Sequence, residues 1–311
     1  MITARPRLAA LTFTALGFLA LVGCKGGGAA NGKYIPEAAT VVGGIDLAGV
    51  QDSKIWKDHV KAMVEAKGKD GLAAMTACNL GLDKWKSLTF GGTTDGGDAK
   101  VAIVIVADGI GKKDNLECAH GKLKESEGGK DPWTVKDDGK LLEMTDNGAI
   151  AYVIDDNTIA MAGKDWAADV AKLTKGEGKS AFDGALKDLI GRTDTGKQIW
   201  FAGTLPAAIG GMAAGQIGAT PKDIAGYLDF SSGVAVQTSV GVATKDEADA
   251  VKTKIEGMYN LMVKDMAKAQ GISDDTLGSV KFSTDGTAVT FEAKVSDEEV
   301  GKSIAKLAPM L

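Results

Sequence analysis

The chain has 311 residues, 44% of them hydrophobic and 25% charged, with a formal net charge of −5. This length and balance predict a folded protein with a sizeable core, and they argue against a disordered or wholly membrane-embedded chain. Lys and Arg form no cluster along the sequence, so the composition also argues against nucleic acid as a partner.

Residues 1–23 have the parts of an export signal. Two arginines precede an apolar run over residues 8–22, which is shorter than the roughly twenty residues of a spanning helix. The run ends in Leu21-Val22-Gly23-Cys24, which resembles the lipobox of bacterial lipoproteins. The resemblance implies cleavage between Gly23 and Cys24, a diacylglycerol anchor on the Cys24 thiol, and acylation (as with palmitate) of the new amino terminus. The alternative is an ordinary cleaved signal followed by a coincidental cysteine.

Residues 24–33 comprise that cysteine and a glycine-rich segment, which predicts a flexible tether. Lys25 stands where the inner-membrane retention pattern of enteric bacteria has Asp. By this resemblance the outer membrane is favoured, with the domain facing the periplasm or the cell surface. The expected partner at Cys24 is therefore a membrane, reached through the lipid anchor.

Cys78 and Cys118 are the two cysteines that remain once Cys24 is assigned to the lipobox. In an oxidising compartment they predict a disulfide bond that closes a loop of about forty residues. The competing interpretations are a metal site and a redox pair, but the sequence has neither a Cys-x-x-Cys spacing nor a nearby second ligand.

The exported part shows the same order of elements twice, which indicates an internal duplication. In the first copy, periodicity and turn signals predict an opening strand and helix, two paired strands, a second helix, three hairpin strands and a closing helix. The predicted strands are 40–47, 86–92, 100–108, 140–144, 150–154 and 158–162; the helices include 113–127 and one with a stripe of Trp166, Val170 and Leu173.

The second copy repeats this order, with strands predicted at 198–205, 227–231, 233–243, 279–283 and 288–295. Thr244, with Glu247 at the reciprocal position, predicts the start of a long helix that ends at Gly271. Ser296 with Glu299 caps the closing helix in the same way. Residues 181–192 predict a short amphipathic helix between the copies.

The predicted fold is therefore α+β, with two tandem similar halves of antiparallel sheet, residues 34–195 and 196–311, and helices packed on one face. Periodicity does not decide whether the halves share one continuous sheet or form separate domains.

No motif predicts a catalytic residue, a metal site or a cofactor. His59 and His120 lie beside helix stripes, and the chain has no Gly-x-Ser-x-Gly elbow for a hydrolase and no ligand spacing for zinc. Residues 176–180 lack the first glycine of a phosphate-binding loop. The acidic pairs at 155–156 and 274–275 lack the terminal Glu of a calcium loop.

Met258, Met262 and Met266 recur at four-residue steps on the long helix of the second copy. At this spacing they predict part of the buried face of the helix. The alternative is that their thioether side chains line an adaptable cavity for an apolar ligand.

The sequence favours a non-enzymatic envelope lipoprotein, a binding or structural module held at the membrane that engages a protein partner through a sheet edge or a helix face. The alternative is a carrier of lipid or another apolar ligand, which the methionines support. A third interpretation is an enzyme whose site is assembled from residues far apart in the sequence.

Overall fold

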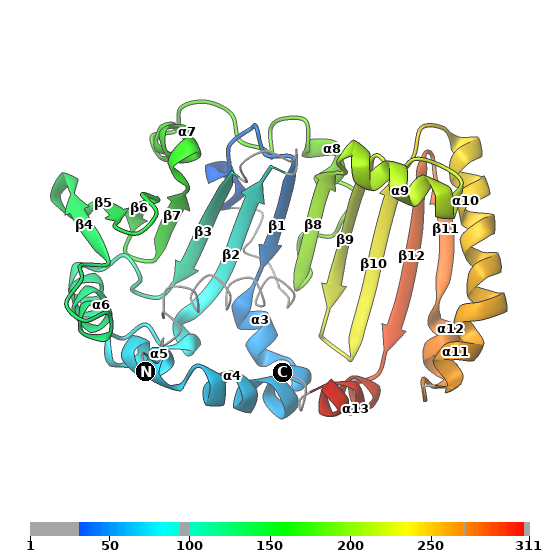
Figure 1. Ribbon diagram of the computed structural model, residues 1–311, viewed down its shortest axis with the longest axis horizontal. Helices are drawn as coiled ribbons and strands as arrows, with labels where there is room; N and C mark the ends of the chain where they lie inside the picture. Colours follow the sequence, from blue (N-terminus) through cyan, green and yellow to red (C-terminus); the bar gives the residue numbers. More distant parts are fainter. Residues whose placement is uncertain (1–30, 94–99, 270, 308–311) are drawn as a thin grey trace, which may run out of the picture.

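Twelve strands of the described residues form one antiparallel sheet (Figure 1). The structure is a computed structural model that describes residues 31–93, 100–269 and 271–307. The first half of the chain contains η1 Gly32–Tyr34, β1 Val41–Ile45, α3 Leu47–Asp52, η2 Trp56–Val60, α4 Lys61–Lys67, α5 Lys69–Ala77, η3 Leu82–Lys84, β2 Trp85–Gly92, β3 Val101–Ala107, α6 Lys113–Ser126, β4 Trp133–Lys136, η4 Asp137–Gly139, β5 Leu141–Met144, β6 Ile150–Asp155, β7 Thr158–Ala162, α7 Lys164–Thr174 and α8 Lys187–Ile190. The second half contains β8 Ile199–Thr204, α9 Ala207–Ile217, β9 Asp223–Asp229, β10 Val234–Gly241, α10 Lys245–Met258, η5 Tyr259–Val263, α11 Lys264–Ala269, α12 Asp274–Ser279, β11 Lys281–Asp285, β12 Ala288–Val295 and α13 Asp297–Leu307.

The two halves of the chain meet where β1 pairs with β8. The strand order is β11-β12-β10-β9-β8-β1-β2-β3-β7-β6-β5-β4. In both directions from this junction, three consecutive strands are followed by later strands in reverse order: the hairpin β12-β11 after β8, β9 and β10, and the four strands β7-β6-β5-β4 after β1, β2 and β3. The prediction of an α+β fold is confirmed, and of the two arrangements that periodicity left open, the structure has the continuous sheet.

Helices cover both faces of the sheet, whereas the sequence predicted helices on one face. Val42 of β1 packs in a cluster with Trp166 of α7 on one face. Ile45, on the opposite face of the same strand, packs against Leu47 of α3. The central strands carry apolar side chains on both sides, so both of their faces have to be removed from water.

Several element boundaries differ from the predicted ones. Leu47, predicted to end the first strand, begins α3, because the Asp46 carboxylate accepts a hydrogen bond from the Gly49 N–H (3.0 Å) and caps that helix. Strand β4 was not predicted, because it has only four residues, three of them exposed, and so short a segment gives a weak periodic signal. The helix predicted at 181–192 is reduced to the four residues of α8.

The buried carboxylate of Glu299 ties the C-terminal helix α13 to α12. Its oxygens accept hydrogen bonds from the Ser273 N–H (2.6 Å) and the Thr276 hydroxyl. The Glu299 N–H in turn donates to the Ser296 hydroxyl (3.3 Å), which confirms the predicted cap. These hydrogen bonds to the ionised form, that from Thr276 above all, lower the pKa of Glu299 to about 2.

The free energy of unfolding is expected to fall as the pH is lowered from 4.5, the ordinary pKa of a Glu side chain, to about 2. Over this window the unfolded chain binds a proton at Glu299 that the folded protein does not, so acid favours unfolding. Glu299→Gln is expected to cost about 1–3 kcal/mol at neutral pH and to flatten this acid dependence. Urea unfolding across the window measures both effects. Glu298→Gln, at the exposed neighbour paired with Lys302, is the control, and an unchanged slope in the Glu299 variant would contradict the prediction.

Candidate functional site

The long helix of the second half runs along the edge strand β11 (Figure 1). Its start is as predicted, because the Glu247 N–H donates to the Thr244 hydroxyl (3.2 Å). Ala248 and Val251 are buried on its inner side in a cluster with Val289 of β12. The first part of this helix, α10, is therefore an ordinary amphipathic helix packed on the sheet.

From the end of α10 onward, the helix carries large apolar side chains on its outer side. We call these five residues the helix surface: Met258, Leu261, Met262, Val263 and Met266, which are 43%, 81%, 60%, 48% and 61% exposed. The prediction that the three methionines belong to the core is wrong. Their exposure also speaks against the alternative that they line an enclosed cavity.

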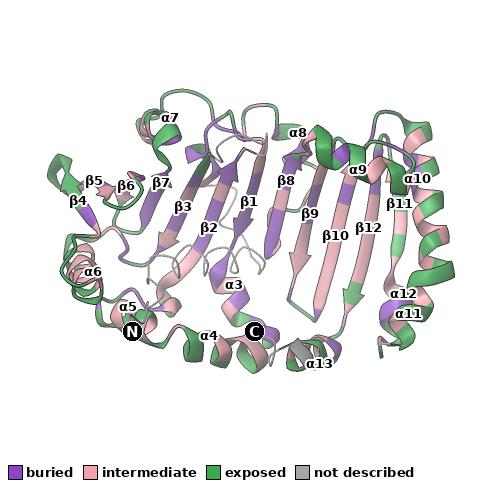
Figure 2. Ribbon diagram, in the orientation of Figure 1, coloured by how far each residue is buried: buried purple, intermediate pink, exposed green. Residues whose placement is uncertain are grey.

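A π-helical turn, η5, follows Met258 in this helix. Such a turn has hydrogen bonds from i to i+5 and shifts the residues that follow it relative to the α-helical period. Tyr259, rather than Met258, faces the sheet: its hydroxyl donates to the Leu277 carbonyl (2.7 Å), and its ring lies 5.7 Å from that of Phe282. The methionines at four-residue steps are exposed, and Figure 2 shows long exposed stretches along the ribbon of α10.

Helix α9, which contacts α10, carries two more exposed apolar side chains. These are Ile209 and Met212, 47% and 72% exposed. Among the described residues, every large exposed apolar side chain except Val101 and Val135 lies on α9 or on α10–α11. Apolar residues scattered singly over a surface are normal, whereas several on one helix are the kind of concentration often found at interaction surfaces.

The charges close to the helix surface are balanced in sign. Lys264 is followed by Asp265 in the sequence, and Lys268 forms an ion pair with Asp274 (2.5 Å). The helix surface therefore offers apolar contact area, and the charges around it give no electrostatic potential of one predominant sign.

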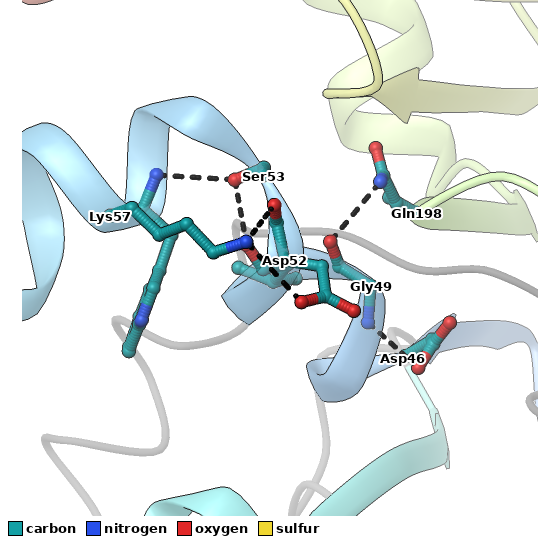
Figure 3. A network of polar contacts seen from close by, with 8 residues as sticks. Asp46, Gly49, Asp52, Ser53, Lys57 and Gln198 are labelled. Carbon is teal, nitrogen blue, oxygen red and sulfur yellow. Dashed lines mark hydrogen bonds and ion pairs between the residues drawn. The ribbon is translucent and has the colours of Figure 1, made fainter.

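A polar network between α3, η2 and β8 is a second candidate site (Figure 3). Lys57 Nζ donates to the carbonyl (2.8 Å) and the carboxylate (3.3 Å) of Asp52. Gln198 Nε2 donates to the Gly49 carbonyl (3.3 Å), and the Ser53 hydroxyl donates to the Val50 carbonyl (2.6 Å) rather than to a base. These contacts close turns and hold α3 against β8, so the network is structural.

A cleft of about 550 Å³ lies beside this network. Helices α3, α4 and α5 supply most of its walls, which include Gln51, Trp56, Lys61 and Leu72. The cleft contains both lysines and acidic residues, and Lys61 faces its own partner Glu65 (3.8 Å). It has no reactive pair that would distinguish it as a catalytic site.

Cys78 and Cys118 form the predicted disulfide, with their Cα atoms 5.4 Å apart. His120 lies 3.2 Å from the Trp133 carbonyl, whereas His59 lies against Gly301 of α13, where an added Cβ would be 2.5 Å from the His59 Nε2. The two histidines thus contact different elements. Within residues 31–93, 100–269 and 271–307, no three His, Cys, Asp or Glu side chains are grouped as metal ligands would be.

Gly23 and Cys24, the predicted cleavage and lipidation residues, lie outside the described residues. In the part of the chain that the structure describes, no helix combines the length and the apolar character needed to cross a bilayer.

No protein-family model matches the chain, and no curated protein matches it. Among solved structures, the chain is similar to crystal forms of TP0453, a Treponema envelope protein. Crystal form III is 10% identical with a TM-score of 0.50, covering 88% of this chain and 97% of that chain. Crystal form I is 8% identical with a TM-score of 0.49, covering 88% and 96%. At such low identity, the likeness shows a shared fold and no particular function.

Proposed function

We propose that this protein is a non-enzymatic envelope lipoprotein, anchored through Cys24, whose domain also lies against the bilayer through its helix surface. The observation that carries the proposal is the exposure of five large apolar side chains on one helix. An envelope role is compatible with the fold shared with TP0453. By the lipobox resemblance, the outer membrane is the favoured location.

A helix that lies in the plane of the membrane interface has one apolar side and charged flanks. Here Leu261 and Met262 would enter the acyl boundary, while Lys264 and Asp265 stay in water. Each fully buried apolar side chain contributes about 1.5–3 kcal/mol. Because the flanking charges are balanced, the attraction is apolar, and binding should depend little on salt.

The anchor and the helix surface supply two separate signals for membrane binding. Acyl chains tether the amino terminus, whereas the helix surface would bring the folded domain itself onto the bilayer. The several acyl chains of the anchor suffice for stable attachment, so the helix surface would set how the folded domain lies on the bilayer rather than whether the protein is held there.

Replacing Leu261 and Met262 together with Asp is expected to weaken binding of the unlipidated Cys24→Ala protein to phospholipid vesicles by about a hundredfold. The loss has a simple cause, since two apolar contacts are removed and two charges resist entry into the bilayer. Vesicle flotation at low and high salt measures the partition. The matched control is Val135→Asp, at an exposed valine on the far edge strand β4, which should leave binding unchanged.

Fractionation of the lipidated protein tests the anchor itself. The wild-type chain should sediment with membranes and carry the mass of its acyl groups, and Cys24→Ala combined with the two Asp substitutions should be soluble. If the Cys24→Ala protein does not bind vesicles, docking through the helix surface is refuted. A wild-type protein without acyl mass would refute the anchor.

A further inference from the structure

The cleft beside α3 has the size of a site for a small organic molecule. Its volume is about 550 Å³, and ligand pockets in general have roughly 300–1,000 Å³. The residues that line it come from one stretch of the chain, from α3 to η3, so we call it the α3–η3 cleft. Four-residue steps place Lys57, Lys61, Glu65, Lys69 and Ala73 on one side of the helices from η2 to α5, and all five line the cleft.

One part of the lining is apolar. Leu72 and Ala73 of α5 lie there together with Leu82 of η3. Gln51 Nε2 of α3 donates to the Leu82 carbonyl (2.8 Å), so a hydrogen bond joins α3 to η3 at the cleft. An apolar group that binds beside these side chains is removed from water, which favours its binding.

Trp56 of η2 brings a hydrogen-bond donor to the same cleft. Its side chain lines the cleft and is only 7% exposed. Within the part of the chain that the structure describes, the indole N–H donates to no atom, yet it is not closed off from solvent. The N–H of a buried Trp usually has a partner. Because Trp56 is otherwise buried, the cleft is where this N–H is open to one.

Two of the acidic side chains in the lining are already paired with lysines. Asp52 accepts a hydrogen bond from Lys57 (3.3 Å). Asp83 forms an ion pair with Lys84 (3.1 Å), which lies outside the lining. Because a cation lies next to each of these carboxylates, they contribute little negative potential to the cleft.

Two other lysines keep hydrogen-bond donors for a ligand. Lys61 Nζ lies 3.8 Å from the Glu65 carboxylate, which is too far for a hydrogen bond. Lys69 forms no ion pair with a carboxylate of the described residues. Together with the Trp56 N–H, these two ammonium groups give the cleft a surplus of donors beside its apolar wall.

We propose that the α3–η3 cleft binds an amphipathic organic anion, a carboxylate with an apolar body. The acid group accepts hydrogen bonds from the Trp56 N–H and from the ammonium groups of Lys61 and Lys69, while the body lies against Leu72 and Leu82. A neutral apolar molecule would cover these donors without offering them an acceptor. An inorganic anion would leave the apolar wall in water.

The test measures binding of dansylglycine, whose dansyl group is an apolar body and whose carboxylate is the acid group. The protein is the Cys24→Ala chain that also carries Leu261→Asp and Met262→Asp, so that the helix surface does not bind the probe. Dansyl fluorescence should rise and saturate at about one probe per chain. Dansylamide, which has no acid group, should bind at least about tenfold more weakly. Salt should weaken the binding of dansylglycine alone.

Replacing Lys61 and Lys69 together with Gln is expected to weaken dansylglycine binding by about tenfold, because both cations near the acid group are lost. The matched control is Lys67→Gln with Lys113→Gln, which removes two charges on α4 and α6 outside the lining. The control should leave the affinity unchanged. Far-UV circular dichroism of each variant confirms that it has folded.

The Trp56 donor is tested without a substitution, because Trp56 is buried. The chain has five tryptophans, and the indole N–H of each gives its own resonance in a nitrogen-labelled protein. One of these resonances should shift as dansylglycine binds, and it should not shift with dansylamide. Indole resonances that all stay in place at saturation would refute the role of Trp56.

Three further outcomes would overturn the proposal. Equal affinities for dansylglycine and dansylamide would show that the acid group is not recognised. Equal weakening by the two pairs of lysine substitutions would place the probe outside the cleft. Displacement of dansylglycine by inorganic phosphate, but not by chloride of equal ionic strength, would assign the donors to an inorganic anion. Because the cleft and the helix surface are formed by different elements, each of these outcomes leaves the proposed function unchanged.

Discussion

Replacing Trp200 with Ala is expected to lower the free energy of unfolding by about 3–5 kcal/mol, the usual cost of truncating a buried Trp. Trp200 is fully buried on β8 and pairs with Gly44 of β1. Its indole occupies the space above Gly44, where an added Cβ would be 2.2 Å from Nε1, and Phe182 meets its ring edge-on at 5.6 Å. Because β1 and β8 join the two halves, the cavity would weaken the whole sheet.

Urea unfolding followed by circular dichroism and by fluorescence measures this effect and shows whether both halves unfold together. Trp85→Phe, at a half-buried position, is the control and should cost much less. Gly44→Ala should be destabilising in the wild type and better tolerated once Trp200 is Ala, since the colliding ring is gone. This account would be contradicted if the effects of Gly44→Ala and Trp200→Ala on the free energy of unfolding were additive. It would also be contradicted if Trp200→Ala lowered that free energy by less than about 1 kcal/mol.

Replacing Cys78 and Cys118 together with Ser is expected to cost about 2–5 kcal/mol. The disulfide spans 40 residues of sequence and restricts the unfolded chain over that loop. In the folded protein Cys78 is buried in a cluster with Trp133, so the substitution also places a hydroxyl in apolar surroundings.

Reduction of the wild-type protein with dithiothreitol separates these two contributions, because it opens the loop without introducing a hydroxyl. The reduced wild type and the double Ser variant should both unfold at lower urea concentration, with the variant lower still. The double Ser variant itself should not respond to dithiothreitol. A wild-type midpoint that does not change on reduction would contradict a stabilising role for the disulfide.

The order of elements could be predicted because it depends on local patterns. The cap at Thr244 with Glu247 and the cap at Ser296 with Glu299 are satisfied within one helical turn, and the structure contains both. The hairpin strands around Asp285 and the buried stripe of Trp166, Val170 and Leu173 likewise follow from residues close in sequence. The disulfide could be predicted by counting cysteines, since only Cys78 and Cys118 remain once Cys24 is assigned to the lipobox.

The helix surface could not be predicted in the same way. Sequence spacing assumed a continuous α-helix packed along its whole length, but the helix contains a π-helical turn at Tyr259–Val263, and Met258, Met262 and Met266 are exposed. The sequence did contain one indication of an exposed apolar surface. The segment from Met258 to Val263 is apolar at most positions rather than along a single stripe. A helix that is apolar on several sides has more apolar surface than one sheet face can cover.

The sequence by itself determined the helix caps, the turns and the α+β character, because each of these depends on residues within a few positions of one another. Tertiary structure alone decided that the halves share one sheet, that helices cover both faces, and which apolar side chains stay exposed. Those outcomes depend on register between distant strands and on where a helix extends past the sheet edge, and such contacts are set by the packing of the whole chain.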